Sequence, residues 1–304
     1  MPELPEVEII KRGLKNKIIG RKIDDIDVKE PKIFRGDRSK VIGSKISKII
    51  RHAKMIEIDF ANGKALLIHL KMTGQLVFQG KVKSEKPARR RSASADAGGG
   101  KIDEVRGGHP DKNYLGKLPN KFTHVIFRFK DGSVLYFNDL RKFGYIKIFD
   151  QKELGESKEL KNLGPDPFTK GLNEEYLMHI ASKRPRAKIK QILMDQTVIS
   201  GIGNIYADES LFCAGISPLR QARDVSRTEF SKLIGCIKKV LKKGLEYGGS
   251  SENTFVNVEG KQGKMQEHFQ IYRKTGQNCP RGCGKVKRIV VGGRGTHFCP
   301  VCQH

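Results

Sequence analysis

The first three residues of the chain could perform covalent chemistry. If Met1 is removed, Pro2 becomes the N-terminal residue and exposes a secondary amine. An α-amine has a pKa of about 8, so a useful fraction of it is a neutral nucleophile at physiological pH. The carboxyl group of Glu3 follows at once and could act as a general acid or base beside that amine. A Met-Pro start is also permissive in many proteins, so these residues alone do not decide the chemistry.

A second set of chemically active residues is a group of four cysteines near the C-terminus. They form two close pairs and are Cys279, Cys283, Cys299 and Cys302. Four thiolates suit a tetrahedral zinc ion, and such a site is structural because no ligand position is left open for water. The clustering also argues for a reducing compartment and against a disulfide framework. Cys213 and Cys236 have apolar, helical surroundings, and we interpret them as plain core thiols.

Two hydrophobic periods predict the elements that position these groups. Helical spacing over residues 3–18 predicts a helix directly after the N-terminus. From about residue 23 to 148, apolar and polar residues alternate, and Asn-Gly and Asp-Gly turns recur. This pattern predicts the antiparallel hairpins of a β-sandwich. Helical spacing returns from about 172 to 245, and short strands are expected around the four cysteines.

The predicted fold class is therefore α+β, in a chain of 304 residues. We expect a β-sandwich domain over 1–149, a linker over 150–171, a helical domain over 172–270 and a zinc-finger β-hairpin over 271–304. The stretch 81–121 is rich in Gly, Ser, Lys and Arg and is expected to be a mobile insertion.

The charge of the chain points to a polyanionic partner. Lys and Arg total 59 against 33 Asp and Glu, a formal net charge of +26, which predicts binding to nucleic acid. A hydrophobic content of 37% excludes a wholly disordered chain, and no apolar run approaches the length of a spanning helix. We expect a monomer that binds no membrane and is intracellular, in the cytoplasm or nucleoid of a bacterium or the nucleus of a eukaryote.

Longer segments resemble, in order along the chain, those of the formamidopyrimidine-DNA glycosylases, bifunctional enzymes of base-excision repair. They are MPELPEVE (1–8), RHAK (51–54), HLKMTGQL (69–76), NDLRKFG (138–144), LGPDPF (163–168), LMDQTVISGIGNIYADESLF (193–212) and GGRGTHFCPVCQ (292–303). Together they span nearly the entire chain except the stretch 81–121. The resemblance implies that the β-sandwich over 1–149 is the catalytic domain and identifies the helical domain over 172–270 as a helix-two-turns-helix DNA-binding domain.

The resemblance also implies a mechanism. Pro2 would attack C1′ of a nucleotide carrying an oxidised purine (8-oxoguanine or a formamidopyrimidine), expel the base and form a Schiff base. β- and δ-elimination from that Schiff base would then cleave the abasic site. Glu3 would donate protons during base loss, and Lys54 and Arg294 would act as proton donors or phosphate contacts.

Flipping the damaged base out of duplex DNA leaves a gap, and the resemblance implies which residues fill it and hold the DNA. Five residues are expected to bind DNA: Met72, Arg141 and Phe143 as a wedge, and Asn204 and Lys190 near phosphates. Gly201 and Gly203 would let the amides at a helix N-terminus approach a phosphate.

The chain departs from the family pattern at several positions. Lys71 stands where the family usually has Gly, Leu140 where Pro is usual and Lys142 where Arg is common, and three residues separate the first two cysteines instead of two. Two other hypotheses remain: a DNA-binding protein of this fold without catalysis, and a glycosylase for oxidised pyrimidines. The segment 248–270 is expected to cap the lesion, but its residues do not indicate the preferred base.

Overall fold

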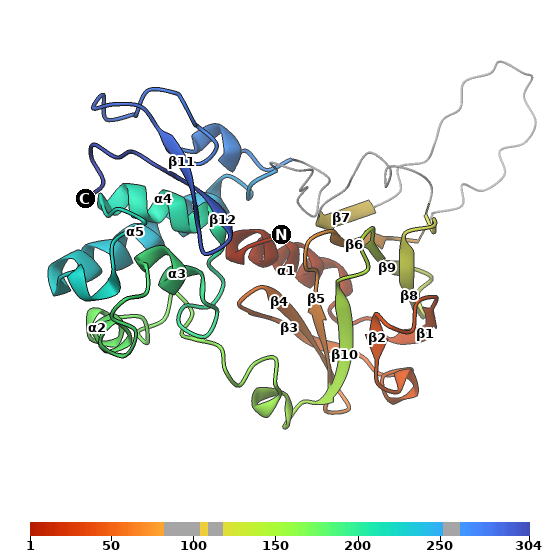
Figure 1. The fold of residues 1–304 in the computed structure, drawn as a ribbon. Coiled ribbons are helices and arrows are strands. Elements are labelled where there is room, and N and C mark those ends of the chain that lie inside the picture. The colour runs from red at the N-terminus through yellow and green to blue at the C-terminus, as the bar shows by residue number, and fades with distance from the viewer. Residues whose placement is uncertain (82–103, 109–117, 252–261) are drawn as a thin grey trace, which may run out of the picture.

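The structure is a computed structural model that describes residues 1–81, 104–108, 118–251 and 262–304. A strand-rich part and a helix-rich part lie side by side, with helix α1 (Leu4–Ile18) between them (Figure 1). The expected α+β class is confirmed. Among the described residues, no helix combines the length and the apolar character that a membrane span requires.

The strand-rich part contains two five-stranded sheets packed on each other. Their strand orders are β1-β8-β9-β6-β7 and β2-β10-β5-β4-β3, and pairing is antiparallel except between β2 and β10. The strands are β1 (Ile23–Val28), β2 (Phe34–Arg35), β3 (Ile46–His52), β4 (Met55–Phe60), β5 (Lys64–His69), β6 (Gly74–Gln79), β7 (Glu104–Gly108), β8 (Thr123–Phe129), β9 (Val134–Asp139) and β10 (Tyr145–Asp150). The expected β-sandwich is thus present.

Tight turns with glycine connect the hairpins where the sequence predicts them. Gly63 between β4 and β5 has φ +77°, and Gly132 between β8 and β9 has φ +83°. Strand β4 differs from the half-buried strand that its alternating residues suggest, because Glu57 and Asp59 are buried as well. Apolar side chains of the connection that follows β10, including Leu154, Leu160 and Leu163, pack over that face of the sheet.

Part of the stretch expected to be a mobile insertion is ordered. Residues 104–108 form strand β7, which pairs antiparallel with β6 at the edge of its sheet. The expectation for 81–121 is therefore wrong at this strand and again at residues 118–121, which the structure also describes. The remainder of the insertion, residues 82–103 and 109–117, lies outside the described residues.

The helix-rich part has its own core and carries the C-terminal hairpin. Its elements are α2 (Glu174–Lys183), α3 (Ile189–Met194), α4 (Asn204–Ala214), α5 (Arg227–Glu246), the 3-10 turn η5 (Met265–His268), β11 (Lys287–Val291) and β12 (Arg294–Phe298). Helix α5 begins with a capping box, in which Ser226 accepts from the Glu229 amide at 3.3 Å and Glu229 accepts from the Ser226 amide at 2.9 Å.

Helix α1 belongs to both cores. Val7, Ile10 and Leu14 pack in the core of the sandwich, whereas Leu4 packs in the core of the helix-rich part. The Leu4 amide also donates to the carbonyl of Gly201, at 3.0 Å. The first turn of the chain therefore holds the two parts together.

The interpretation of Cys213 and Cys236 as plain core thiols is wrong. They form a disulfide between the last turn of α4 and the middle of α5, with Cα atoms 5.7 Å apart. Hydrophobic spacing predicts that both residues face the helical core, but it does not determine which side chains meet there. The pairing depends on how the two helices cross.

Candidate active site at the junction of the two parts

The carboxylate of Glu3 caps the N-terminus of helix α4. Its oxygens accept hydrogen bonds from the backbone amides of Gly203 at 2.7 Å, Ile205 at 3.0 Å and Tyr206 at 3.4 Å. The first amides of a helix have no partner within the helix, and the helix dipole favours a negative charge there. This cap fixes the residue that follows Pro2 against a helix 200 residues later in the chain.

The two glycines before α4 allow this approach. A Cβ atom at position 203 would lie 2.4 Å from the Glu3 carboxyl carbon, and one at 201 would lie 2.7 Å from Leu4 Cδ1. The sequence analysis expected these glycines to admit a phosphate to the helix amides. In the structure the amides of Gly203, Ile205 and Tyr206 bind Glu3 instead, so that interpretation is wrong for these three amides.

Burial sets the electrostatics around Glu3. It raises the pKa of the Glu3 carboxyl; the positive charge of Lys54 opposes this shift, and the negative charge of Glu6 adds to it. Burial likewise lowers the pKa of Lys54, and the carboxylates of Glu3 and Glu6 oppose that change. Lys54 Nζ donates to the carbonyl oxygen of Ile202 at 2.7 Å. The junction thus brings an acid and an amine together away from bulk water.

Glu6 holds the backbone around the N-terminus. Its Oε2 accepts from the Glu3 amide at 2.9 Å, and its Oε1 accepts from the Tyr206 hydroxyl at 2.8 Å and the Ser250 amide at 2.9 Å. Pro2 is buried beside these groups, while Met1 is 41% exposed. Removal of the exposed methionine would leave the Pro2 amine at the junction.

The three residues expected to form the wedge lie on two loops tied by one buried carboxylate. Asp139 accepts from the amides of Arg141 at 3.2 Å and Gly144 at 2.7 Å, and from the Thr73 hydroxyl. The Thr73 hydroxyl also accepts from the Arg141 amide at 3.1 Å, which joins the loop of Met72 to the loop of Phe143.

The side chains at the tips of these loops are exposed. Met72 is 40% exposed and Phe143 54%, and the Arg141 guanidinium lies over the Phe143 ring at 4.7 Å. Lys71 and Lys142 have φ values of +52° and +55°, in the left-handed region that favours glycine. The glycine that the family usually has at position 71 would adopt such a φ without strain, whereas here a lysine adopts it.

Lys190 is not placed where it could contact a phosphate, contrary to the sequence-based expectation. Its side chain is fully buried, and its Nζ lies 2.6 Å from Asp208 Oδ1 and donates to Thr296 Oγ1 at 2.8 Å. Asn204 is used internally as well, since its Nδ2 donates to the carbonyl of Gly295 at 2.9 Å. Both residues fasten the C-terminal hairpin to the helices.

Arg294 remains available to an anion at the surface. It is exposed at the start of β12, after the turn formed by Gly292 and Gly293 with φ +56° and +74°. Its charge also acts on Lys54, whose pKa it helps to lower. The two cations are therefore close enough to interact electrostatically.

The four C-terminal cysteines converge as a metal site requires. Their Sγ atoms all lie within 4.8 Å of one another, with 3.7 Å between Cys279 and Cys302 and 3.5 Å between Cys283 and Cys299. Four sulfurs at about 2.3 Å from a tetrahedral zinc ion are about 3.8 Å apart, so the arrangement fits one zinc ion. Gly282, with φ +73°, provides the turn that brings Cys283 back across the three intervening residues.

Several positioning residues were not found from the sequence. Asp139 lies within a recognised segment, but nothing in the pattern distinguishes it from a surface aspartate. Asp208 completes a buried ion pair, and His297 contacts it with a backbone N–H at 2.8 Å rather than joining the zinc site. Of the segment expected to cap the lesion, residues 252–261 lie outside the described residues.

Replacing Lys190 with methionine should destabilise the protein by about 3–5 kcal/mol, because Asp208 would remain buried without its cation. Urea denaturation measures the change, and Lys161→Met, which alters an exposed ion pair with Glu156, serves as the control and should have little effect. If Lys190→Met kept full stability and only weakened DNA binding, the result would instead support a phosphate contact by Lys190.

The protein should hold one zinc ion per chain, with four sulfur ligands at about 2.3 Å by X-ray absorption. Cys299→Ala should lose the metal and disorder the β11–β12 hairpin while the sandwich stays folded, because the site is structural. His304→Ala should keep the metal. Much less than one zinc per chain in fully active protein would contradict this assignment.

Comparisons with known proteins agree along the whole chain. The family model of the formamidopyrimidine-DNA glycosylase N-terminal domain matches residues 1–146, that of the H2TH domain of the same enzymes matches 163–256, and that of a zinc finger found in FPG and IleRS matches 276–304. The zinc-finger match and the cysteine geometry together establish the C-terminal hairpin as a zinc finger for one zinc ion.

Relatives match over nearly their full length. The formamidopyrimidine-DNA glycosylase of Pelotomaculum thermopropionicum is 35% identical, with 100% of this chain and 99% of that protein covered. The Roseobacter denitrificans enzyme is 33% identical, with 100% of both covered. Lactococcus lactis Fpg in complex with abasic-site DNA superimposes with a TM-score of 0.81 at 30% identity over 99% of both chains. The chain therefore belongs to the formamidopyrimidine-DNA glycosylase family, whose members are DNA-repair glycosylases with abasic-site lyase activity.

Proposed function

We propose that this enzyme excises 8-oxoguanine and formamidopyrimidines from duplex DNA and cleaves the abasic site by β- and δ-elimination through a Schiff base on Pro2. The observation that carries the proposal is the junction of Pro2, Glu3 and Lys54. Burial there raises the pKa of the Glu3 carboxyl and lowers the pKa of the Lys54 amine. A DNA-binding protein without catalysis would have no need of an acid and an amine held together in this way.

The chemistry follows from these groups. The neutral Pro2 amine attacks C1′, and the glycosidic bond breaks as the base leaves with a proton from Glu3. Glu3, now a carboxylate, takes the proton from the nitrogen and passes it to the ring oxygen O4′ as the C1′–O4′ bond breaks, and the nitrogen lone pair forms the C=N bond of an iminium ion. That ion acidifies the neighbouring C–H positions, so the 3′ and then the 5′ phosphate are eliminated. A raised pKa lets Glu3 carry a proton closer to neutral pH than a free glutamate does.

The remaining residues would hold the DNA. Lys54 and Arg294 would neutralise phosphates near the lesion or donate protons to the leaving groups. The exposed tips Met72, Arg141 and Phe143 would fill the gap that the flipped base leaves, at a cost of a few kcal/mol for unstacking. Asp139 holds both loops from beneath, because it accepts from the Thr73 hydroxyl on one loop and from the amides of Arg141 and Gly144 on the other.

We also propose the oligomeric state, the DNA partner, the compartment and the domain bounds of the enzyme. It acts as a monomer on damaged double-stranded DNA, without a membrane, and the bacterial relatives favour the cytoplasm and nucleoid of a bacterium. The working domains follow the division into 1–149, 150–171, 172–270 and 271–304. The net charge of +26 supports a polyanionic partner.

Borohydride should trap a covalent adduct between the Met1-processed protein and a duplex containing 8-oxoguanine opposite C. Peptide mapping should find the DNA on Pro2, because its secondary amine forms the Schiff base. Protein that retains Met1 is the matched control, and it should bind the duplex without excision or trapping. An adduct on Lys54 would contradict the assignment.

Gly203→Ala should slow excision by about 10²–10⁴-fold, the usual contribution of a positioned acid or base, because the new methyl group would displace the Glu3 carboxylate. Single-turnover kinetics on the 8-oxoguanine duplex measure the effect. Gly235→Ala on α5 is the matched control, since a Cβ atom there meets nothing within 4 Å. Equal rates for the two variants would refute the role of the cap.

Arg294→Ala should weaken binding to a tetrahydrofuran-containing duplex and reduce the slope of log K against log salt by about 0.9, the value for one phosphate contact. Zinc content should be unchanged, which separates the arginine from the metal. Titrations at several salt concentrations decide the matter, and an unaltered slope would show that Arg294 contacts no phosphate.

A further inference from the structure

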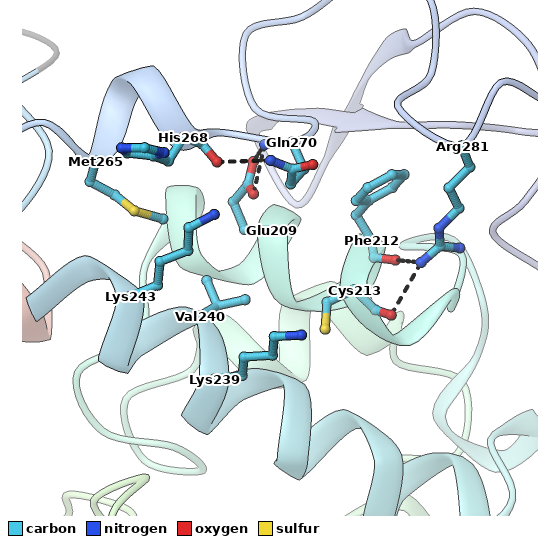
Figure 2. Close-up of a pocket in the computed structure, with 10 residues that line it drawn as sticks. All are labelled: Glu209, Phe212, Cys213, Lys239, Val240, Lys243, Met265, His268, Gln270 and Arg281. Atoms are coloured by element: carbon cyan, nitrogen blue, oxygen red, sulfur yellow. Dashed lines mark hydrogen bonds between the residues drawn. The ribbon is translucent and has the colours of Figure 1, made fainter. Parts of the chain in front are cut away.

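A pocket lies in the helix-rich part, lined by none of the residues assigned to DNA or catalysis. It has a volume of about 380 Å³ and lies where α4, α5, η5 and the first turn of the zinc finger meet (Figure 2). Its lining includes Glu209, Phe212, Cys213, Lys239, Lys243 and Arg281. This volume is enough for a small organic ligand.

The charge of the pocket favours an anion. Lys239 and Lys243 are one helical turn apart and rise from the same face of α5, and the structure shows no ion pair between either of them and a described residue (Figure 2). The one carboxylate in the lining, Glu209, is already engaged, because it accepts from the amides of Gln270 at 3.0 Å and Ile271 at 2.9 Å. Arg281 contributes a third cation at the rim.

One sulfur of the disulfide is accessible from this pocket. Cys213 lines it and is partly exposed, whereas Cys236 is buried, at 9% exposure, and is not part of the lining. Figure 2 shows the Cys213 sulfur on the side of α4 that faces α5. Lys239 follows Cys236 by one turn of α5, so its positive charge would stabilise a thiolate released there.

We propose that the pocket binds a small anionic thiol, which opens the Cys213–Cys236 bond by thiol–disulfide exchange. The lysines bind the carboxylate of the ligand, and its thiolate attacks Cys213 Sγ. The S–S bond breaks, and its electron pair leaves on Cys236 Sγ, which takes a proton from water. The product is a mixed disulfide at Cys213, a modification site that goes beyond the proposed function.

A second thiol completes the cycle. It attacks the ligand sulfur of the mixed disulfide and releases a small symmetrical disulfide and the Cys213 thiol. Two small thiols are thereby oxidised as one protein disulfide is reduced, and the small disulfide drives the reverse reaction. The pocket adjoins the zinc finger without sharing its ligands, since Arg281 donates to the carbonyls of Phe212 at 2.6 Å and Cys213 at 3.2 Å, so the zinc ion should stay bound when the bond opens.

The test compares thiols of different charge on the zinc-loaded protein purified without reductant. The probes are 3-mercaptopropionate (anionic), 2-mercaptoethanol (neutral) and cysteamine (cationic), and each rate is divided by the rate of the same thiol with a small uncharged disulfide. Quenching, alkylation and peptide mass spectrometry follow both cysteines. The normalised rate should be at least tenfold higher for 3-mercaptopropionate than for cysteamine, with the first adduct on Cys213 and a smaller ratio at high salt.

Paired variants identify the origin of the charge preference. The double variant Lys239→Gln/Lys243→Gln should lose most of it, whereas Lys232→Gln/Lys242→Gln, which makes the same charge change elsewhere on α5, should retain it. Equal normalised rates for the three thiols, a first adduct on Cys236, or two free thiols in the protein as purified would overturn the proposal. Zinc release in step with bond opening would do so too, because it would locate the reaction at the zinc cysteines.

Discussion

The hydrogen bonds between the Glu3 carboxylate and the start of α4 are the contact on which the junction depends. They join the first turn of the chain to a helix 200 residues later, and they bury the acid beside the N-terminus. The N-terminal residues of a chain are otherwise poorly held, because chain termini tend to fray, and Pro2 is the proposed nucleophile. Here Glu3 is fixed by α4, Leu4 packs in the helical core, and α1 continues into the sandwich.

The same contact explains the local electrostatics and the choice of residues around it. Burying Glu3 raises its pKa, and the backbone amides that it accepts from limit that shift. Only glycine at position 203 leaves room for the Glu3 carboxylate. A motif that resembles a phosphate-binding loop therefore binds this carboxylate instead. Lys54 and Arg294, the proposed phosphate contacts, would then act beside a junction that is already formed.

Much of this could be predicted from the sequence, for physical reasons. Alternation and Asn-Gly or Asp-Gly turns are local signals, so the hairpins were predicted correctly, and the cysteine spacing specified the zinc finger. Partners that meet only through tertiary packing were not predictable: Lys190 with Asp208, Cys213 with Cys236, and Glu3 with the helix amides. The sequence analysis singles out Lys190, the two cysteines and Glu3, but their spacing in the sequence carries no information about the groups that they contact.

Residue-resolved hydrogen exchange tests the central claim most directly. In the wild-type protein the amides of Gly203 and Ile205 should be protected, because the Glu3 carboxylate accepts from both. In Glu3→Ala these two amides should exchange much faster, while amides in the middle of α5 keep their protection. Unchanged protection at Gly203 and Ile205 in the variant would show that the carboxylate does not hold the helix, and would contradict this account of the junction.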